Sequence, residues 1–248
     1  MNGAPTIYAT AEELAQGAAS ILGSLLHTGA HDRGMATLAL SGGGTPRRVY
    51  QVLASQALRP LVPWERIHVF WGDERCVPPE HPDSNFRMAD EALLRHVPIP
   101  GANIHRMKGE LPPDQGRAMY EQELSAVFHL AAGTMPEFDV VLLGLGDDGH
   151  TASLFPGTDS LSEGTRPVTS VFVEKLRSNR VTLTLPAINN ARHIIFLVSG
   201  RGKAAILGEV LKNGEQKFPA QRVRPIKGDL RWLIDQEAAS QLKQGGKL

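Results

Sequence analysis

The chain has 248 residues, of which 42% are hydrophobic and 21% are charged, a composition typical of folded globular proteins. Its 26 Lys and Arg residues balance 26 Asp and Glu residues, which argues against nucleic acid or an anionic membrane surface as a partner. Cys76 is the single cysteine, so an internal disulfide is excluded and a reducing, cytoplasmic location is expected. Apolar runs such as 194–198 are far shorter than the roughly 20 residues that span a bilayer.

Strands and helices are expected to alternate along the chain. The first expected helix covers residues 10–28, because Thr10 and Glu13 have the spacing of a capping box. Strands are expected at 36–40, 67–71, 138–143, 193–198 and 230–234, and further helices at 49–53, 84–95, 114–131 and 202–212. Runs of β-branched residues at 167–173 and 180–185 fit an antiparallel pair. We predict one domain over residues 1–248 with an α/β fold, a doubly wound and mainly parallel sheet flanked by helices, with a small antiparallel addition.

A glycine loop follows the expected strand 36–40 and reads Ser-Gly-Gly-Gly-Thr-Pro over residues 41–46. Backbone N–H groups of successive glycines can converge on an anion at the start of a helix, where the helix dipole also favours negative charge. A tight turn without a ligand is the alternative, although three glycines exceed what a turn needs. No Gly-Lys-Ser/Thr follows, which disfavours a nucleoside triphosphate. We predict a phosphate site that comprises Gly42, Gly43, Gly44 and Thr45.

A second glycine-rich segment, residues 144–149, matches the G-x-G-x-x-G pattern of dinucleotide sites. We reject that interpretation, because Asp147 and Asp148 would place negative charge against a pyrophosphate. An aspartate two positions before a histidine can instead orient the imidazole and stabilise its protonated form, as a general base acting on water requires. Asp148 and His150 are therefore the candidate catalytic residues, and a purely structural histidine–carboxylate pair is the alternative.

Two cations, Arg75 and Lys203, are expected at the sheet edge that holds the glycine loop, and a third candidate, Arg180, opens the expected strand 180–185. Arg75 and Arg180 offer bidentate forks for a phosphate and Lys203 offers a point charge, although each could instead be solvated. The nine histidines are scattered and none belongs to an H-E-x-x-H motif, so we expect no metal site.

Four segments together resemble the 6-phosphogluconolactonase family. They read LSGGGTP at 40–46, WGDER at 71–75, GLGDDGHTASLFPG at 144–157 and RVTLTLP at 180–186, and the similarity extends over nearly the whole chain. The resemblance implies the fold shared with glucosamine-6-phosphate deaminase (NagB) and ribose-5-phosphate isomerase. It also implies hydrolysis of 6-phospho-D-glucono-1,5-lactone to 6-phospho-D-gluconate in the oxidative pentose phosphate pathway, without a metal or an organic cofactor.

Two alternative functions are weighed against hydrolysis. In the related deaminases a glutamate follows the histidine by five positions, but that position is Phe155 here. Asp73 occupies the place of the carboxylate base that an enolising isomerase needs, so this position does not separate the two activities. The missing glutamate is the feature that favours the hydrolase. A non-catalytic sugar-phosphate sensor is the second alternative, and it would not need Asp148 and His150. The expected partner is a small phosphorylated sugar lactone, and a monomer or weak homo-oligomer is expected.

Overall fold

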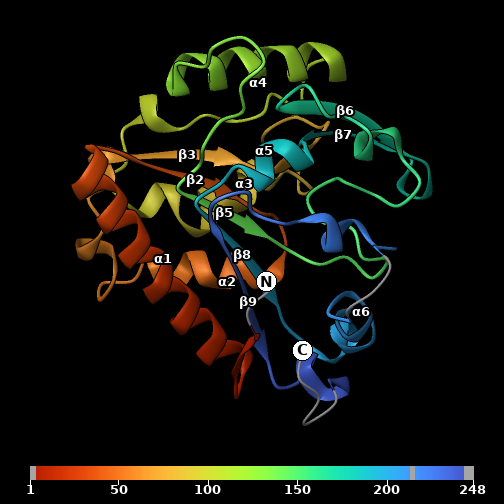
Figure 1. Ribbon diagram of the computed structural model, residues 1–248. Coiled ribbons are helices and arrows are strands. Elements are labelled where there is room, and N and C mark those ends of the chain that lie inside the picture. Colours follow the sequence, from red (N-terminus) through yellow and green to blue (C-terminus); the bar gives the residue numbers. More distant parts are fainter. Residues whose placement is uncertain (1–3, 213–215, 243–248) are drawn as a thin grey trace.

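The computed structural model describes residues 4–212 and 216–242. Its main sheet has six strands in the order β1-β9-β8-β5-β2-β3, and all neighbouring strands are parallel (Figure 1). These strands are β1 (Thr6–Tyr8), β2 (Ala36–Leu40), β3 (Ile67–Trp71), β5 (Val140–Leu143), β8 (His193–Val198) and β9 (Asp229–Asp235). A smaller antiparallel sheet has the order β4-β7-β6 and comprises β4 (Asp73–Arg75), β6 (Val168–Val173) and β7 (Ser178–Leu183). The predicted fold class is thereby confirmed.

Helices flank the main sheet and one of them packs on the small sheet (Figure 1). They are α1 (Ala11–Arg33), α2 (Gly44–Leu53), α3 (Asn85–Ala92), α4 (Pro113–Phe128), α5 (Leu185–Asn189) and α6 (Ala204–Val210). Thr10 is confirmed as the N-cap, because its Oγ1 accepts a hydrogen bond from the Glu13 N–H at 3.1 Å. The reciprocal bond of the predicted capping box goes to the preceding residue, since the Glu13 carboxylate accepts the Ala9 N–H at 3.3 Å. The helix α1 ends before Gly34, whose φ of 80° is a left-handed conformation that glycine adopts without strain. No described helix has the length and apolar character needed to cross a membrane.

Several boundaries differ from the predicted ones. The helix α2 begins at Gly44, within the glycine loop, and α6 is shorter than the predicted 202–212. The strands β1 and β4 and the short helix α5 were not predicted. β4 has no apolar signal because its three residues are Asp, Glu and Arg, yet the first two are buried and their polar groups are paired within the fold.

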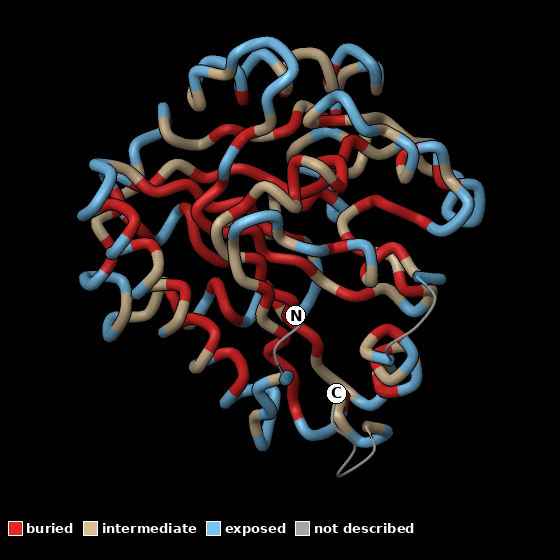
Figure 2. Tube along the Cα trace, viewed as in Figure 1, coloured by how far each residue is buried: buried red, intermediate tan, exposed pale blue. Residues whose placement is uncertain are grey.

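The core lies along the central strands, which are buried over most of their length (Figure 2). Every residue of β2 and β5 is buried, as expected for parallel strands covered on both faces. Phe196 of β8 and Trp232 of β9 stack with their ring centroids 3.9 Å apart, which fills the space beside two neighbouring strands.

The strand order places a topological switch point between β2 and β5. From β2 the chain continues to β3 on one side, and it later returns to β5 on the other side. Ligands of open α/β sheets bind in the crevice outside the carboxyl ends of strands at such a point. The glycine loop follows β2 and the segment 144–150 follows β5, so both lie at this crevice. A β-carbon added to Gly144 would lie 3.8 Å from Ser41 Oγ, which shows how closely the two loops approach.

Two tyrosines hold the ends of β2 and β3 in the same way. The Tyr50 hydroxyl accepts from the Ser41 N–H at 2.9 Å and donates to the Ser41 carbonyl at 2.8 Å. The Tyr120 hydroxyl accepts from the Trp71 N–H at 2.9 Å and donates to the Trp71 carbonyl at 3.0 Å.

We expect Tyr50→Phe and Tyr120→Phe each to lower the free energy of unfolding by about 1–3 kcal/mol, because each leaves buried backbone groups unpaired. Urea denaturation measures this loss, and midpoints equal to that of the unchanged protein would contradict it.

Candidate active site

A histidine and an aspartate form a hydrogen-bonded pair in the turn after β5. Asp148 Oδ1 accepts from the His150 backbone N–H at 3.2 Å and lies 2.5 Å from His150 Nδ1. Burial raises the pKa of Asp148, but hydrogen bonds from Lys175 and His150 outweigh it and hold that pKa at about 2. Because the carboxylate stays ionised at neutral pH, Nδ1 carries the proton of the neutral ring, and Nε2 is the nitrogen that can accept one. The predicted catalytic residues are therefore paired in the geometry of an oriented base.

The His150 ring is fixed by packing as well as by Asp148. Its face stacks on Phe155, with ring centroids 4.0 Å apart and planes inclined by 27°. On the other side, a β-carbon added to Gly146 would lie 2.0 Å from His150 Nδ1, so a larger residue at 146 would displace the imidazole. Gly146 thus allows the close approach of the imidazole to the turn, and the chain after it forms further turns where a dinucleotide fold would begin a helix.

A buried carboxylate, Asp73, connects this turn to the glycine loop. Ser153 Oγ donates to Asp73 Oδ2 at 2.6 Å, and Asn85 Nδ2 donates to the Asp73 carbonyl at 2.9 Å. Asn85 in turn lies against the glycine loop, because a β-carbon added to Gly42 would lie 2.0 Å from Asn85 Oδ1. The chain Ser153–Asp73–Asn85–Gly42 therefore spans the switch point and sets the spacing of the two loops.

Glu74 anchors the helix that carries Asn85. Its carboxylate accepts the backbone N–H groups of Asn85 at 2.7 Å and Phe86 at 2.8 Å, and the Ser84 hydroxyl at 3.1 Å. Burial raises the pKa of Glu74, although these backbone hydrogen bonds oppose the rise. The sequence analysis missed both Glu74 and Asn85 as site-building residues. The available signal was two adjacent carboxylates directly after an apolar strand, where burial demands polar partners.

The glycine loop ends at the N-terminus of α2. Gly43 has a φ of 104° and precedes the first helical residue, and no side chain of a described residue caps it. The N–H groups of Gly44 and Thr45 have no partner within the helix, because the first turn of any helix lacks acceptors for them. This backbone is suited to an anion, as predicted from the loop sequence, and phosphate binding there stays a prediction.

Arg75 and Arg180 lie directly opposite each other in the antiparallel β4–β7 pair. In the described part of the chain each Nε atom is buried without a hydrogen-bond partner, while Arg75 Nη1 donates to the Asp83 carbonyl. Burial, and then the charge of Arg75, lowers the pKa of Arg180. Like charges at directly opposed strand positions are destabilising. Two such guanidinium groups therefore form a site that a bound anion would stabilise.

Lys203 lies at the same sheet edge, in the turn after β8, but its charge is already engaged. Its ammonium group pairs with Asp147 of the 144–150 turn. The turn after β8, which carries Lys203, is held by Asp235, whose carboxylate accepts the Gly200 N–H at 3.0 Å. Of the predicted residues, the structure thus pairs Asp148 with His150, Arg75 with Arg180, and Lys203 with Asp147. Asp73, two residues before Arg75, accepts a hydrogen bond from Ser153, three residues after His150. This contact connects the strand of Arg75 to the turn of His150.

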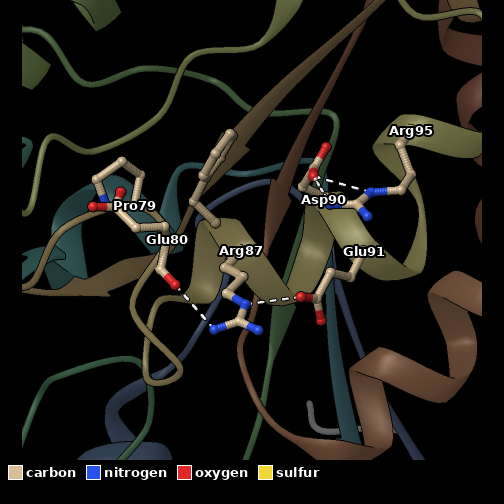
Figure 3. A pocket seen from close by; sticks show the side chains of 7 residues that line it. Pro79, Glu80, Arg87, Asp90, Glu91 and Arg95 are labelled. Atoms are coloured by element: carbon tan, nitrogen blue, oxygen red, sulfur yellow. Dashed lines mark hydrogen bonds and ion pairs between the residues drawn. The ribbon is translucent and has the colours of Figure 1, made fainter.

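A pocket of about 480 Å³ lies beside α3, and its charged side chains pair with one another (Figure 3). Arg87 Nε donates to Glu91 at 2.8 Å, and Arg95 Nη2 donates to Asp90 at 2.5 Å. Both arginines of its lining therefore already have anionic partners, whereas Arg75 and Arg180 form no ion pair with another described residue. Within residues 4–212 and 216–242, no three His, Cys, Asp or Glu side chains gather as a metal site would require.

The arginine pair generates a direct prediction about anions. Inorganic phosphate should bind and raise the melting temperature of the unchanged protein, because only the folded state holds the two guanidinium groups together. We expect Arg180→Met to weaken this binding at least about 10-fold, through loss of one charge-assisted contact. Arg192→Met is the matched control, because Arg192 pairs with Glu137 and Asp139 near the amino end of β8. Equal phosphate affinity in the two variants, measured by calorimetry, would contradict an anion site at Arg180.

Comparisons with known proteins agree with this geometry. Residues 9–232 match the family model described as glucosamine-6-phosphate isomerases/6-phosphogluconolactonase. A curated relative from Synechocystis sp., named 6-phosphogluconolactonase, is 50% identical over 86% of this chain and 87% of its own. The solved 6-phosphogluconolactonase from Trypanosoma cruzi superposes with a TM-score of 0.86 at 30% identity, over 98% of both chains. A structure titled as a monomeric glucosamine-6-phosphate deaminase of the NagB superfamily (TM-score 0.81, 23% identity, 97% of this chain and 100% of its own) shares the fold. The chain therefore belongs to the family of glucosamine-6-phosphate isomerases and 6-phosphogluconolactonases.

Proposed function

We propose that this chain hydrolyses 6-phospho-D-glucono-1,5-lactone to 6-phospho-D-gluconate, a step of the oxidative pentose phosphate pathway. The observation that carries the proposal is the Asp148–His150 pair at the switch point of the sheet. The groups suited to a sugar phosphate are the glycine loop at the same crevice and the half-buried pair of Arg75 and Arg180. The names of the relatives, 6-phosphogluconolactonase in Synechocystis and Trypanosoma cruzi, support the same reaction.

The proposed chemistry needs one base that also returns a proton. His150 Nε2 takes a proton from a water molecule as its oxygen bonds to C1 of the lactone. The tetrahedral intermediate then collapses, the bond between C1 and the ring oxygen breaks, and the imidazolium gives its proton to the departing oxygen. Asp148 stabilises the imidazolium between the two transfers and remains ionised, because its pKa of about 2 lies far below the working pH. The free acid formed at C1 ionises in water.

The phosphate of the substrate supplies binding energy at a distance from the reacting carbon. We assign it to the predicted set Gly42, Gly43, Gly44, Thr45, Arg75, Arg180 and Lys203. Contacts to a remote, non-reacting group can hold C1 in position against the imidazole and so lower the barrier to attack. For Lys203 this role requires exchange of Asp147 for the phosphate.

The other predictions stay predictions. These are one domain over residues 1–248, a cytoplasmic location, the lack of a metal or organic cofactor, and a monomer or weak homo-oligomer. The deaminase is not favoured, because Phe155 stacks on His150 at the position where the deaminases carry a glutamate. The sensor is not favoured, because binding of a sugar phosphate alone would not need the Asp148–His150 pair.

Substitution of the proposed base tests the reaction directly. We expect His150→Ala to lower kcat by about 10²–10⁴ with a modest change in KM, the range typical for loss of a general base. The measurement is a coupled assay on freshly generated lactone, corrected for spontaneous hydrolysis. His193→Ala is the control, because His193 pairs with Asp229 through Nδ1 at the opposite end of the sheet. An unchanged kcat in His150→Ala, or deamination of glucosamine 6-phosphate by the unchanged protein, would refute the proposal.

The phosphate assignment has a separate test. Arg75→Ala and Lys203→Ala should each raise KM for the phosphorylated lactone at least about 10-fold, because a charge-assisted contact is lost. Activity on unphosphorylated D-glucono-1,5-lactone should change less than about 2-fold, because that substrate lacks the group they bind. Equal losses on the two lactones would show that these side chains do not recognise phosphate.

A further inference from the structure

A lysine from the small sheet reaches the Asp148–His150 pair. Lys175 lies in the short helical turn Glu174–Leu176 that joins β6 to β7. Its ammonium group pairs with Asp148 Oδ2, whereas Asp148 Oδ1 holds His150. One carboxylate is thus shared between the proposed base and a cation from a different sheet. Nothing in the local sequence around Asp148 indicates this partner, which is 27 residues away.

Lys175 also lies over the ring that packs against the imidazole. Its Nζ is 5.3 Å from the centroid of Phe155, a distance within the range of a cation–π contact. The Phe155 ring also stacks on the His150 imidazole, with the two ring centroids 4.0 Å apart. Lys175 therefore touches both groups that set the orientation of His150, the carboxylate and the aromatic ring.

We propose that Lys175 is a positioning residue for His150, which holds Asp148 and Phe155 in place and offsets the charge of Asp148 beside the imidazole. The inference rests on the proposed function, in which the neutral imidazole is the working base. Under this proposal, the β6–β7 turn of the small sheet contributes to the catalytic pair that follows β5 of the main sheet.

The charges around the imidazole decide in which direction the loss of Lys175 shifts the protonation of His150. Asp147 and Asp148 are the acidic neighbours in its own turn, and Lys203 and Lys175 are the cations paired with them. With all four present, the neighbouring charges balance. Removal of Lys175 leaves one uncompensated negative charge beside His150, and a nearby opposite charge favours the imidazolium. Lys175 is 54% exposed, so solvent and salt reduce the effect.

The first test observes the imidazole without any assay of activity. In the full-length protein labelled with ¹³C-histidine, the ring signal of His150 is assigned by its loss in His150→Gln and titrated with pH. We expect Lys175→Met to move its midpoint upward by about 0.3–1 pH unit, and Lys175→Arg to restore it, because the arginine keeps the charge. Lys212→Met is the matched control, since Lys212 forms a similar exposed ion pair with Glu209. A midpoint in Lys175→Met equal to that of Lys212→Met would overturn the proposal.

The second test uses the proposed reaction. The acid limb of kcat/KM should move upward in Lys175→Met by the same amount as the ring signal, and kcat above the limb should fall about 2–10-fold with KM within 2-fold. The limb cannot come from Asp148, because its pKa of about 2 leaves it ionised throughout the assay range. A shifted ring signal with full activity in His150→Ala would refute the proposed base and leave the hold of Lys175 on the imidazole intact. An unshifted limb beside an inactive His150→Ala would overturn only the role of Lys175.

Discussion

The site depends on one buried carboxylate, that of Asp73, the first residue of β4. It is 7% exposed and it binds Ser153 from the turn after β5, while its carbonyl binds Asn85 from α3. A buried carboxylate without such partners would cost several kcal/mol, so the partners cannot move apart independently. Because Asn85 also packs against Gly42, the distance between the glycine loop and the His150 turn is set by this contact.

The two sheets contribute different parts of the site. The main sheet is a set of buried apolar strands whose polar loops meet at the switch point, which places the glycine loop beside the His150 turn. The small sheet is rich in charge, and its β4–β7 register sets Arg75 opposite Arg180. The turn between β6 and β7 brings Lys175 to Asp148. The arginines of the proposed phosphate site thus come from the small sheet, and the proposed base comes from the turn after a strand of the main sheet.

The sequence was sufficient for features whose cause is local. The strands 36–40, 67–71 and 193–198 have the predicted bounds, because each is a short apolar run between turn signals. The Asp148–His150 pair is also local, two residues apart. Features that depend on register between distant segments were missed. The arginines were predicted singly, because the sequence predicts no strand at 73–75, and only the pairing of β4 with β7 makes them neighbours. Asn85, Ser153 and Lys175 were missed for the same reason, since their partners lie 12 to 80 residues away.

The central claim is that a sugar phosphate lies across the switch point, with its phosphate at the arginine pair and the glycine loop and with C1 at His150. A crystal structure of the protein with 6-phospho-D-gluconate tests it most directly. The account predicts phosphate oxygens within hydrogen-bond distance of Arg75, Arg180 and the N–H groups of the glycine loop. It also predicts the C1 carboxylate within hydrogen-bond distance, about 3 Å, of His150 Nε2. A phosphate bound at His150, or a sugar seated in the α3 pocket of Figure 3, would contradict it.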